Sequence, residues 1–281
     1  MYQTDPPLSP KETLPTMYDL PSEDPEESGL PDEFHNLQPQ LLRETFQPPT
    51  YGTEEMFIGT DLNLYYDVHH PLWYKRPDWF AVVGVSRFYE AQDLRLSYVI
   101  WQEGVSPLVV VELLSPGTEK EDLGQTPLTS PLIWGNEGGQ PPTKWEVYER
   151  ILRIPYYVVF NRYTDELQVF ALQGERYQEL NLEGRQFWIP SVELGLGVWQ
   201  GTYDGINRQW LRWFDANGNW MPTLAEQREQ ERERANQQQQ QVEQEKQRAE
   251  QEKQRAEQEK QRAERLAKKL RELGIDPDTL S

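Results

Sequence analysis

The stretch LVVVELLSPGTEKED, residues 108–122, decides the fold. Apolar residues run from Leu108 to Leu114 with one interruption, Glu112, between a proline and a Ser-Pro-Gly sequence. A short, valine-rich run with such borders predicts a buried central strand. Side chains alternate along a strand, so Glu112 shares a face with Val110 and points into whatever covers that face. A carboxylate in that position is costly unless another group pairs with it or a metal binds it.

The segments around this strand predict an α/β (α+β) fold with a mixed central sheet flanked by helices. A helix begins at Thr143, a good N-cap residue, and ends before Pro155. A long Pro- and Gly-rich loop precedes it at 123–143. The predicted strands are 62–67, 78–85, 98–102, 108–114, 156–160, 167–172, about 177–182 and 187–189, with a hairpin in 195–220.

Composition divides the chain into three parts. Residues 1–48 form an acidic, Pro-rich arm that is predicted to be largely disordered, with a patch at about 33–46 that docks on the body as a helix. Residues 49–222 form the body. Residues 223–281 form a charged tail in which QEKQRAE occurs three times in succession. A seven-residue period suggests a coiled coil, whereas the alanine-rich seam favours a solvated single helix, so both remain open.

Several function classes are excluded by residue types. The 281 residues include no cysteine, which removes disulfides and thiolate chemistry. The three histidines lack zinc-protease spacing, and no G-x-S-x-G occurs. Neither a signal peptide nor an apolar stretch of ~18 residues is present, so a cytoplasmic protein without membrane association is expected.

Charge argues against a nucleic-acid partner. The net charge of -19 is divided unevenly: residues 1–50 hold 10 acidic and 2 basic residues (-8), residues 51–220 hold 23 and 13 (-10), and residues 221–281 hold 14 and 13 (-1). A body with this balance repels phosphate backbones at long range.

Two carboxylates nevertheless suggest a metal site. Asp78 stands at the mouth of one predicted strand and Glu112 lies in another, and carboxylates of neighbouring strands can share an octahedral oxygen site for Mg²⁺. Lys144 and Tyr148, four residues apart, lie on one helix face, where the lysine can orient a water or stabilise negative charge. Each residue also has an interpretation without chemistry. Asp78 can simply begin a strand, Glu112 can form a buried ion pair with a basic residue, and Lys144 can be a solvated residue of the first helical turn.

The sequence resembles the Uma-two family of predicted endonucleases, within the PD-(D/E)XK nuclease superfamily. The resemblance covers about residues 50–220, and the ending RELGIDPD is similar to tails in the family. The residues that carry it are Pro77-Asp78, Glu112 within VVVELLSP, Ser115, Thr118, Asp122, Lys144, Tyr148 and Pro155-Tyr156-Tyr157.

The resemblance implies a restriction-endonuclease-like core with metal ligands at Asp78 and Glu112. The superfamily lysine normally stands two residues after the glutamate, where this chain has Leu114, so its role passes to Lys144. Asp122 matches a family acid, and about 20 residues separate it from Lys144 where the family has only a few.

Two hypotheses follow from these observations. The first is a Mg²⁺- or Mn²⁺-dependent endonuclease acting on DNA, with Asp78, Glu112 and Lys144 as its catalytic residues and Asp122 and Tyr148 as accessory residues. The second is a catalytically inactive nuclease-like module whose helical tail forms a homodimer or binds a partner.

Overall fold

The computed structural model describes residues 13–16, 33–114, 119–125 and 141–272. The chain divides into two compact units, Met1–Thr223 and Leu224–Ser281. The three-part division at residues 48 and 222 stays a prediction. Most of the predicted disordered arm and most of the 123–143 loop lie outside the described residues.

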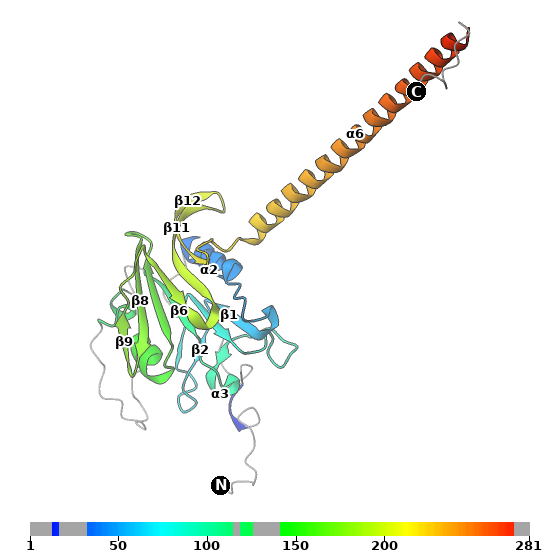
Figure 1. Cartoon of the computed structure of the whole chain (residues 1–281). Coiled ribbons are helices and arrows are strands. Elements are labelled where there is room, and N and C mark those ends of the chain that lie inside the picture. The colour runs from blue at the N-terminus through cyan, green and yellow to red at the C-terminus, as the bar shows by residue number, and fades with distance from the viewer. Residues whose placement is uncertain (1–12, 17–32, 115–118, 126–140, 273–281) are drawn as a thin grey trace. The chain divides into compact units, whose positions relative to one another are not determined.

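A six-stranded sheet forms the centre of the first unit (Figure 1). Strand β6 lies inside it, parallel to β7 and antiparallel to β4, and the remaining neighbours are antiparallel, so the predicted mixed sheet is confirmed. The strands, in their order across the sheet, are β1 (Met56–Thr60), β4 (Trp79–Val83), β6 (Val109–Leu114), β7 (Tyr156–Asn161), β8 (Glu166–Gln173) and β9 (Arg176–Glu179).

Two three-stranded sheets accompany the central sheet among the described residues of the first unit. One contains β10 (Gln186–Ile189), β11 (Leu194–Tyr203) and β12 (Ile206–Phe214), and its β11–β12 pair is the hairpin predicted within 195–220. The other contains β2 (Leu64–Tyr65), β3 (Tyr74–Lys75) and β5 (Tyr98–Val99). Short helical turns lie at η1 (Thr53–Glu55), α3 (Ile100–Glu103) and η3 (Pro190–Val192).

The start of the sheet differs from the prediction. The first strand is β1, whereas the predicted 62–67 strand is reduced to the two residues of β2 in a side sheet. Gly59 weakens the strand pattern of β1, yet a side chain there would collide with the Phe80 ring, so its absence permits close pairing with β4. The predicted 98–102 strand likewise shortens to β5, because the chain turns into α3 at Ile100.

Two hydrophobic cores lie on opposite faces of the central sheet. Val109, Val111 and Leu113 of β6 enter the first core together with residues of the β10–β12 sheet. Val110 and Leu114 enter the second core. The period-2 pattern of β6 is therefore confirmed, and Glu112 points toward the second core.

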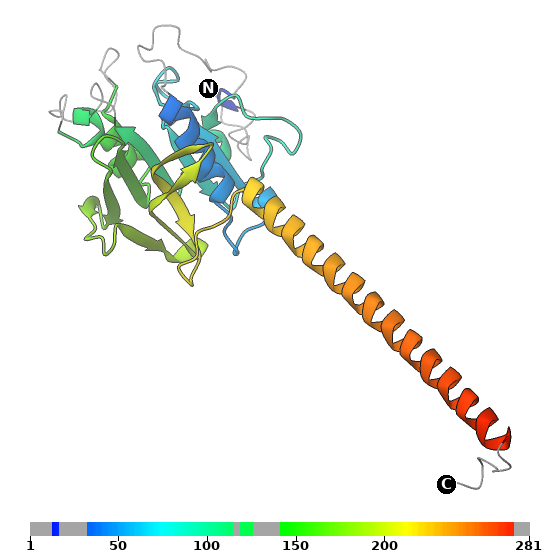
Figure 2. The same cartoon turned by 90° about the horizontal axis from the view of Figure 1, so that it is seen from above.

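Helix α2 (Glu33–Thr45) occupies the patch for which the sequence predicted a docked helix. Its buried side chains Phe34, Leu41 and Leu42 belong to the first core. Figure 2 shows α2 beside the β11–β12 hairpin. The amide of Gln38 donates to the Leu211 carbonyl (2.9 Å) and accepts from the Leu211 N–H (2.8 Å), so a side chain takes the place of a strand neighbour for β12.

The second core is covered by the predicted helix after Thr143. It consists of α5 (Lys144–Glu146) and η2 (Val147–Ile151), a π-helical turn that period-3.6 reasoning did not predict. Thr143 caps it as predicted, in a reciprocal capping box with Glu146.

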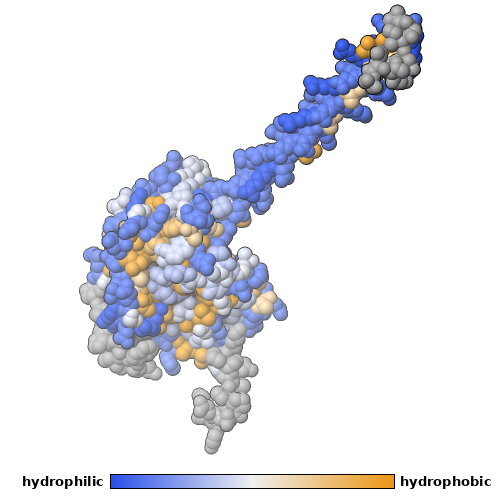
Figure 3. All heavy atoms as spheres, viewed as in Figure 1, coloured by the Kyte–Doolittle hydropathy of each residue, from blue (hydrophilic) through white to orange (hydrophobic). Residues whose placement is uncertain are grey.

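The described part of the second unit is the helix α6 (Leu224–Glu272). None of its residues is buried, and its surface is mostly hydrophilic (Figure 3). Val242 and Leu266 are exposed apolar positions of the seam, and the coiled coil stays a prediction. Within the described parts of the chain, no helix is long and apolar enough to span a bilayer.

Candidate active site

Asp78 and Glu112 lie at the same end of the central sheet, close enough for the charge of Asp78 to act on Glu112. The antiparallel ladder of β4 and β6 ends at the pair Trp79 and Val111. Extending that register by one residue places Asp78 opposite Glu112, and alternation directs both side chains to the same face. The strand pairing therefore places the two residues at the same end of the sheet, and the shared metal site stays a prediction.

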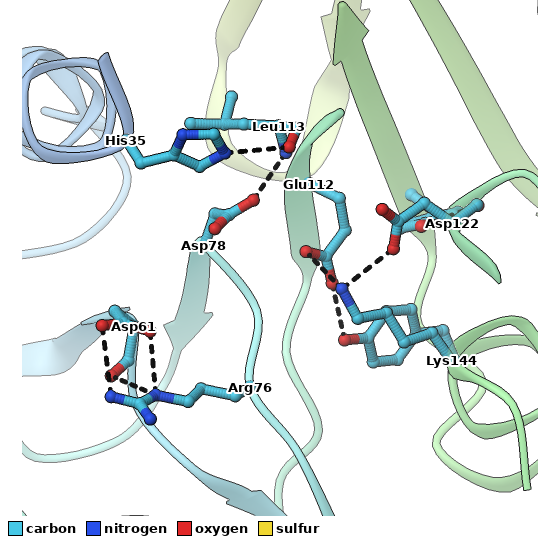
Figure 4. Close-up of polar contacts among 10 residues, drawn as sticks. His35, Asp61, Arg76, Asp78, Glu112, Leu113, Asp122 and Lys144 are labelled. Carbon is cyan, nitrogen blue, oxygen red and sulfur yellow. Dashed lines mark hydrogen bonds and ion pairs between the residues drawn. The ribbon is translucent and has the colours of Figure 1, made fainter. Parts of the chain in front are cut away.

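The backbone of Leu113 is held by two side chains beyond the end of that ladder. Its N–H donates to Asp78 Oδ2 (2.6 Å), and its carbonyl oxygen lies 3.1 Å from His35 Nε2. Figure 4 shows these contacts, with His35 reaching from α2. Asp78 and His35 thus replace the missing strand as partners of the Leu113 peptide groups.

Glu112 is almost fully buried and contacts two side chains of the covering helix. Its Oε1 accepts from the Tyr148 hydroxyl (2.8 Å), and its Oε2 lies 3.1 Å from Lys144 Nζ. Lys144 and Tyr148 therefore lie on one helix face, as the spacing predicted. The π-helical turn begins at Val147, directly before Tyr148, and such turns are frequent at functional sites.

Asp122 completes the cluster. It follows the end of β6 in the short helix α4 (Glu119–Asp122), and its Oδ1 lies 2.9 Å from Lys144 Nζ. A cation at the first residue of a helix is disfavoured by the helix dipole, and here two buried carboxylates offset that cost. The backbone carbonyl of Asp122 also accepts a hydrogen bond from the Tyr157 hydroxyl of β7 (2.9 Å), and this bond ties α4 to the sheet.

Burial and excess negative charge set the protonation of the carboxylates. Burial raises the pKa of Glu112 to about 8, and Asp122 and Asp78 add to this while Lys144 and the Tyr148 hydroxyl oppose it. Burial also raises the pKa of Asp78 above its ordinary value, although Lys144 and the Leu113 N–H favour its charged form. One lysine among three carboxylates leaves a negative excess that a cation would reduce.

Lys144 remains an ammonium group. Burial by itself lowers its pKa, but the charges of Glu112 and Asp122 outweigh burial, so the pKa is raised above its ordinary value. Burial and neighbouring negative charge raise the pKa of Tyr148 as well. Both groups therefore donate hydrogen bonds at neutral pH, and neither can serve as a general base.

The donor types fit a hard divalent ion. Among the residues that the structure describes, no group of three His, Cys, Asp or Glu side chains could hold a metal. Mg²⁺, however, is commonly bound through one or two carboxylates and completed by water and phosphate oxygens. Asp78, Glu112 and the Leu113 carbonyl supply such oxygens, and a carboxylate has about four lone-pair sites, of which Lys144 and Tyr148 use two on Glu112.

All five residues predicted from the sequence belong to this neighbourhood. The alternative for Glu112, a buried ion pair, is present. The alternative for Lys144, a solvated first-turn residue, is wrong, because the Lys144 side chain is 17% exposed and pairs with two carboxylates. Ser115 and Thr118 lie outside the described residues. Sequence reasoning missed His35: the apolar spacing of 33–46 located its helix, but no local pattern indicated a contact with Leu113.

The mixed sheet and its edge carboxylates define a restriction-endonuclease-like domain. A family model described as "Putative restriction endonuclease", Uma2, matches residues 10–204, and the chain belongs to this family. The resemblance found in the sequence is thereby confirmed, and the family gives the chain a nuclease-like role. No curated protein matches the chain.

Proposed function

We propose that the protein is a Mg²⁺- or Mn²⁺-dependent endonuclease that hydrolyses phosphodiester bonds of DNA. The observation that supports the proposal is that Asp78 and Glu112 lie at the same end of the central sheet, with Lys144 Nζ 3.1 Å from Glu112 Oε2. Asp78 and Glu112 would hold the metal, with the Leu113 carbonyl as a further oxygen donor. When bound there, a divalent ion supplies Lewis-acid activation of a phosphoryl oxygen and lowers the pKa of a bound water.

Lys144 has an electrostatic role in this proposal. Because its ammonium group keeps its proton, it stabilises negative charge that develops on the phosphate or orients the attacking water by donating to it. Asp122 holds Lys144 through a second contact, at 2.9 Å, and Tyr148 orients the Glu112 carboxylate through its hydroxyl. These two are positioning residues.

One observation favours the alternative of an inactive nuclease-like module. Both oxygens of Glu112 already have donors, and the raised pKa keeps much of this carboxyl group protonated at neutral pH. In that case the Glu112–Lys144 pair is structural, and α6 would supply the function by binding a partner.

Cleavage of supercoiled plasmid separates the two functions. The wild-type chain should nick plasmid DNA with Mg²⁺ or Mn²⁺ and not with EDTA, while Asp78→Asn and Glu112→Gln should abolish nicking. Asp61→Asn is the matched control, because Asp61 lies at the same sheet edge and pairs with Arg76 instead. Undiminished cleavage by either active-site variant would refute the assignment, and an inert wild-type protein would favour the module.

A further inference from the structure

Three arginines gather at the turn between β7 and β8, at the same end of the central sheet as the candidate active site. In the parallel register of β6 and β7, Leu114 pairs with Asn161, so the turn that begins at Arg162 leaves the same sheet edge as Glu112. The cluster of Arg162, Arg185 and Arg208 is called the arginine cluster below.

A second connection runs through α2. The guanidinium carbon of Arg208 lies 4.3 Å from the centre of the Phe34 ring, and that of Arg162 lies 5.8 Å from it. The next residue, His35, contacts the Leu113 carbonyl at 3.1 Å. Arg162 and Arg208 are therefore linked to the Leu113 peptide, which follows Glu112 in the chain, through the neighbouring residues Phe34 and His35.

The arginine cluster is held together at the surface. Arg208 donates to the Arg162 carbonyl (2.7 Å), and Arg185 donates to the side chain of Gln209. Arg162 donates to the hydroxyl of Tyr163 (2.8 Å), whose side chain is exposed. Asp165 of the same turn pairs with Arg208 (3.7 Å), so a carboxylate partly neutralises one of the three guanidinium groups.

We propose that the arginine cluster and Tyr163 receive the sugar–phosphate backbone of duplex DNA at the sheet end that carries the candidate active site. Stacking engages the face of a guanidinium and fixes the direction of its edge, which carries the N–H donors suited to phosphate oxygens. This local surface supplies the attraction that the acidic body as a whole lacks. The inference rests on the proposed nuclease function and adds to it the route of the substrate.

Salt dependence of DNA binding tests the surface without requiring cleavage. The full chain, in EDTA, is titrated against a fluorescent 20-base-pair duplex at about 50–200 mM salt. Each phosphate contact contributes ~0.9 to the slope of log K against log salt, which is about 3.5-fold in affinity over that range. Arg162→Gln and Arg185→Gln should each lower the magnitude of the slope by ~0.9, and the double variant should lower it by about twice as much.

Arg176→Gln is the matched control, because Arg176 is an exposed arginine on strand β9 that pairs with Glu149. Circular dichroism checks that each variant folds. If Arg162→Gln loosens α2, the Arg185→Gln variant still tests the surface, because the Arg185 side chain is exposed. Unchanged slopes for both cluster variants, or a slope lost equally in Arg176→Gln, would overturn the inference, as would a wild-type chain that binds no duplex at 50 mM salt.

The two proposals fail separately. Arginine-dependent binding by a protein that does not nick plasmid upholds the surface and refutes the nuclease. Nicking that depends on Asp78 but not on the arginine cluster upholds the nuclease and refutes the surface.

Discussion

Replacing Lys144 with methionine should destabilise the protein in a way that depends on pH. Methionine keeps the length of the buried stem and removes the ammonium group, which leaves Glu112 and Asp122 without their shared cation. Removing one partner of a buried pair costs about 3–5 kcal/mol. Because the Lys144 side chain is 17% exposed, we expect the lower end, about 3 kcal/mol, at pH 7.

The sign of the pH dependence follows from Glu112. Its pKa rises from 4.5 to about 8 on folding, so the folded state binds more protons in that window, and stability falls as pH rises through it. Lys144 lowers this pKa, so its removal extends the window above pH 8. Between pH 8 and 9 the variant should lose up to about 1.4 kcal/mol, whereas the wild type, in which Glu112 is already about half ionised at pH 8, should lose about 0.4 kcal/mol.

Urea unfolding followed by tryptophan fluorescence at pH 7, 8 and 9 measures both quantities. Lys120→Met is the control: Lys120 is an exposed lysine of α4, and its replacement should change stability by no more than about 0.5 kcal/mol. A Lys144→Met variant as stable as the wild type at pH 9 would refute the account of the cluster's electrostatics.

Three further predictions concern the site and its support. Tyr148→Phe should cost about 1–3 kcal/mol in urea unfolding, because Glu112 Oε1 loses a buried donor, and an unchanged midpoint would contradict this. Phe34→Ala should cost about 3–5 kcal/mol, because its buried ring stacks on Trp210 at 5.5 Å; a loss below 1 kcal/mol would mean that α2 packs loosely. Mn²⁺ binding measured by calorimetry should strengthen from pH 6 to about 8 with proton release, since Glu112 must ionise to bind; affinity independent of pH would place the metal elsewhere.

Local patterns predicted the elements that carry the site. The valine-rich run around Glu112 specified a buried strand, and Thr143 and Pro155 marked the borders of the helix that covers it. The four-residue spacing of Lys144 and Tyr148 placed both on one face, and both contact Glu112. These predictions succeeded because alternation and capping depend on neighbouring residues alone.

Contacts across the sequence could not be predicted in the same way. The Leu113 peptide is completed by Asp78, 35 residues away, and by His35, 78 residues away, in a helix identified only as a docking patch. Strand β1 escaped prediction because Gly59 weakens its pattern, while its pairing with β4 is a tertiary effect. The π-helical turn departs from the 3.6-residue period that the helix prediction assumed.

The position of a bound metal tests the central claim most directly. Crystals of the full chain soaked with Mn²⁺ would reveal the ion by its anomalous scattering. We expect one peak in joint contact with carboxylate oxygens of Asp78 and Glu112, with Lys144 Nζ nearby. No peak at that sheet edge, with the Glu112–Lys144 pair intact, would contradict it.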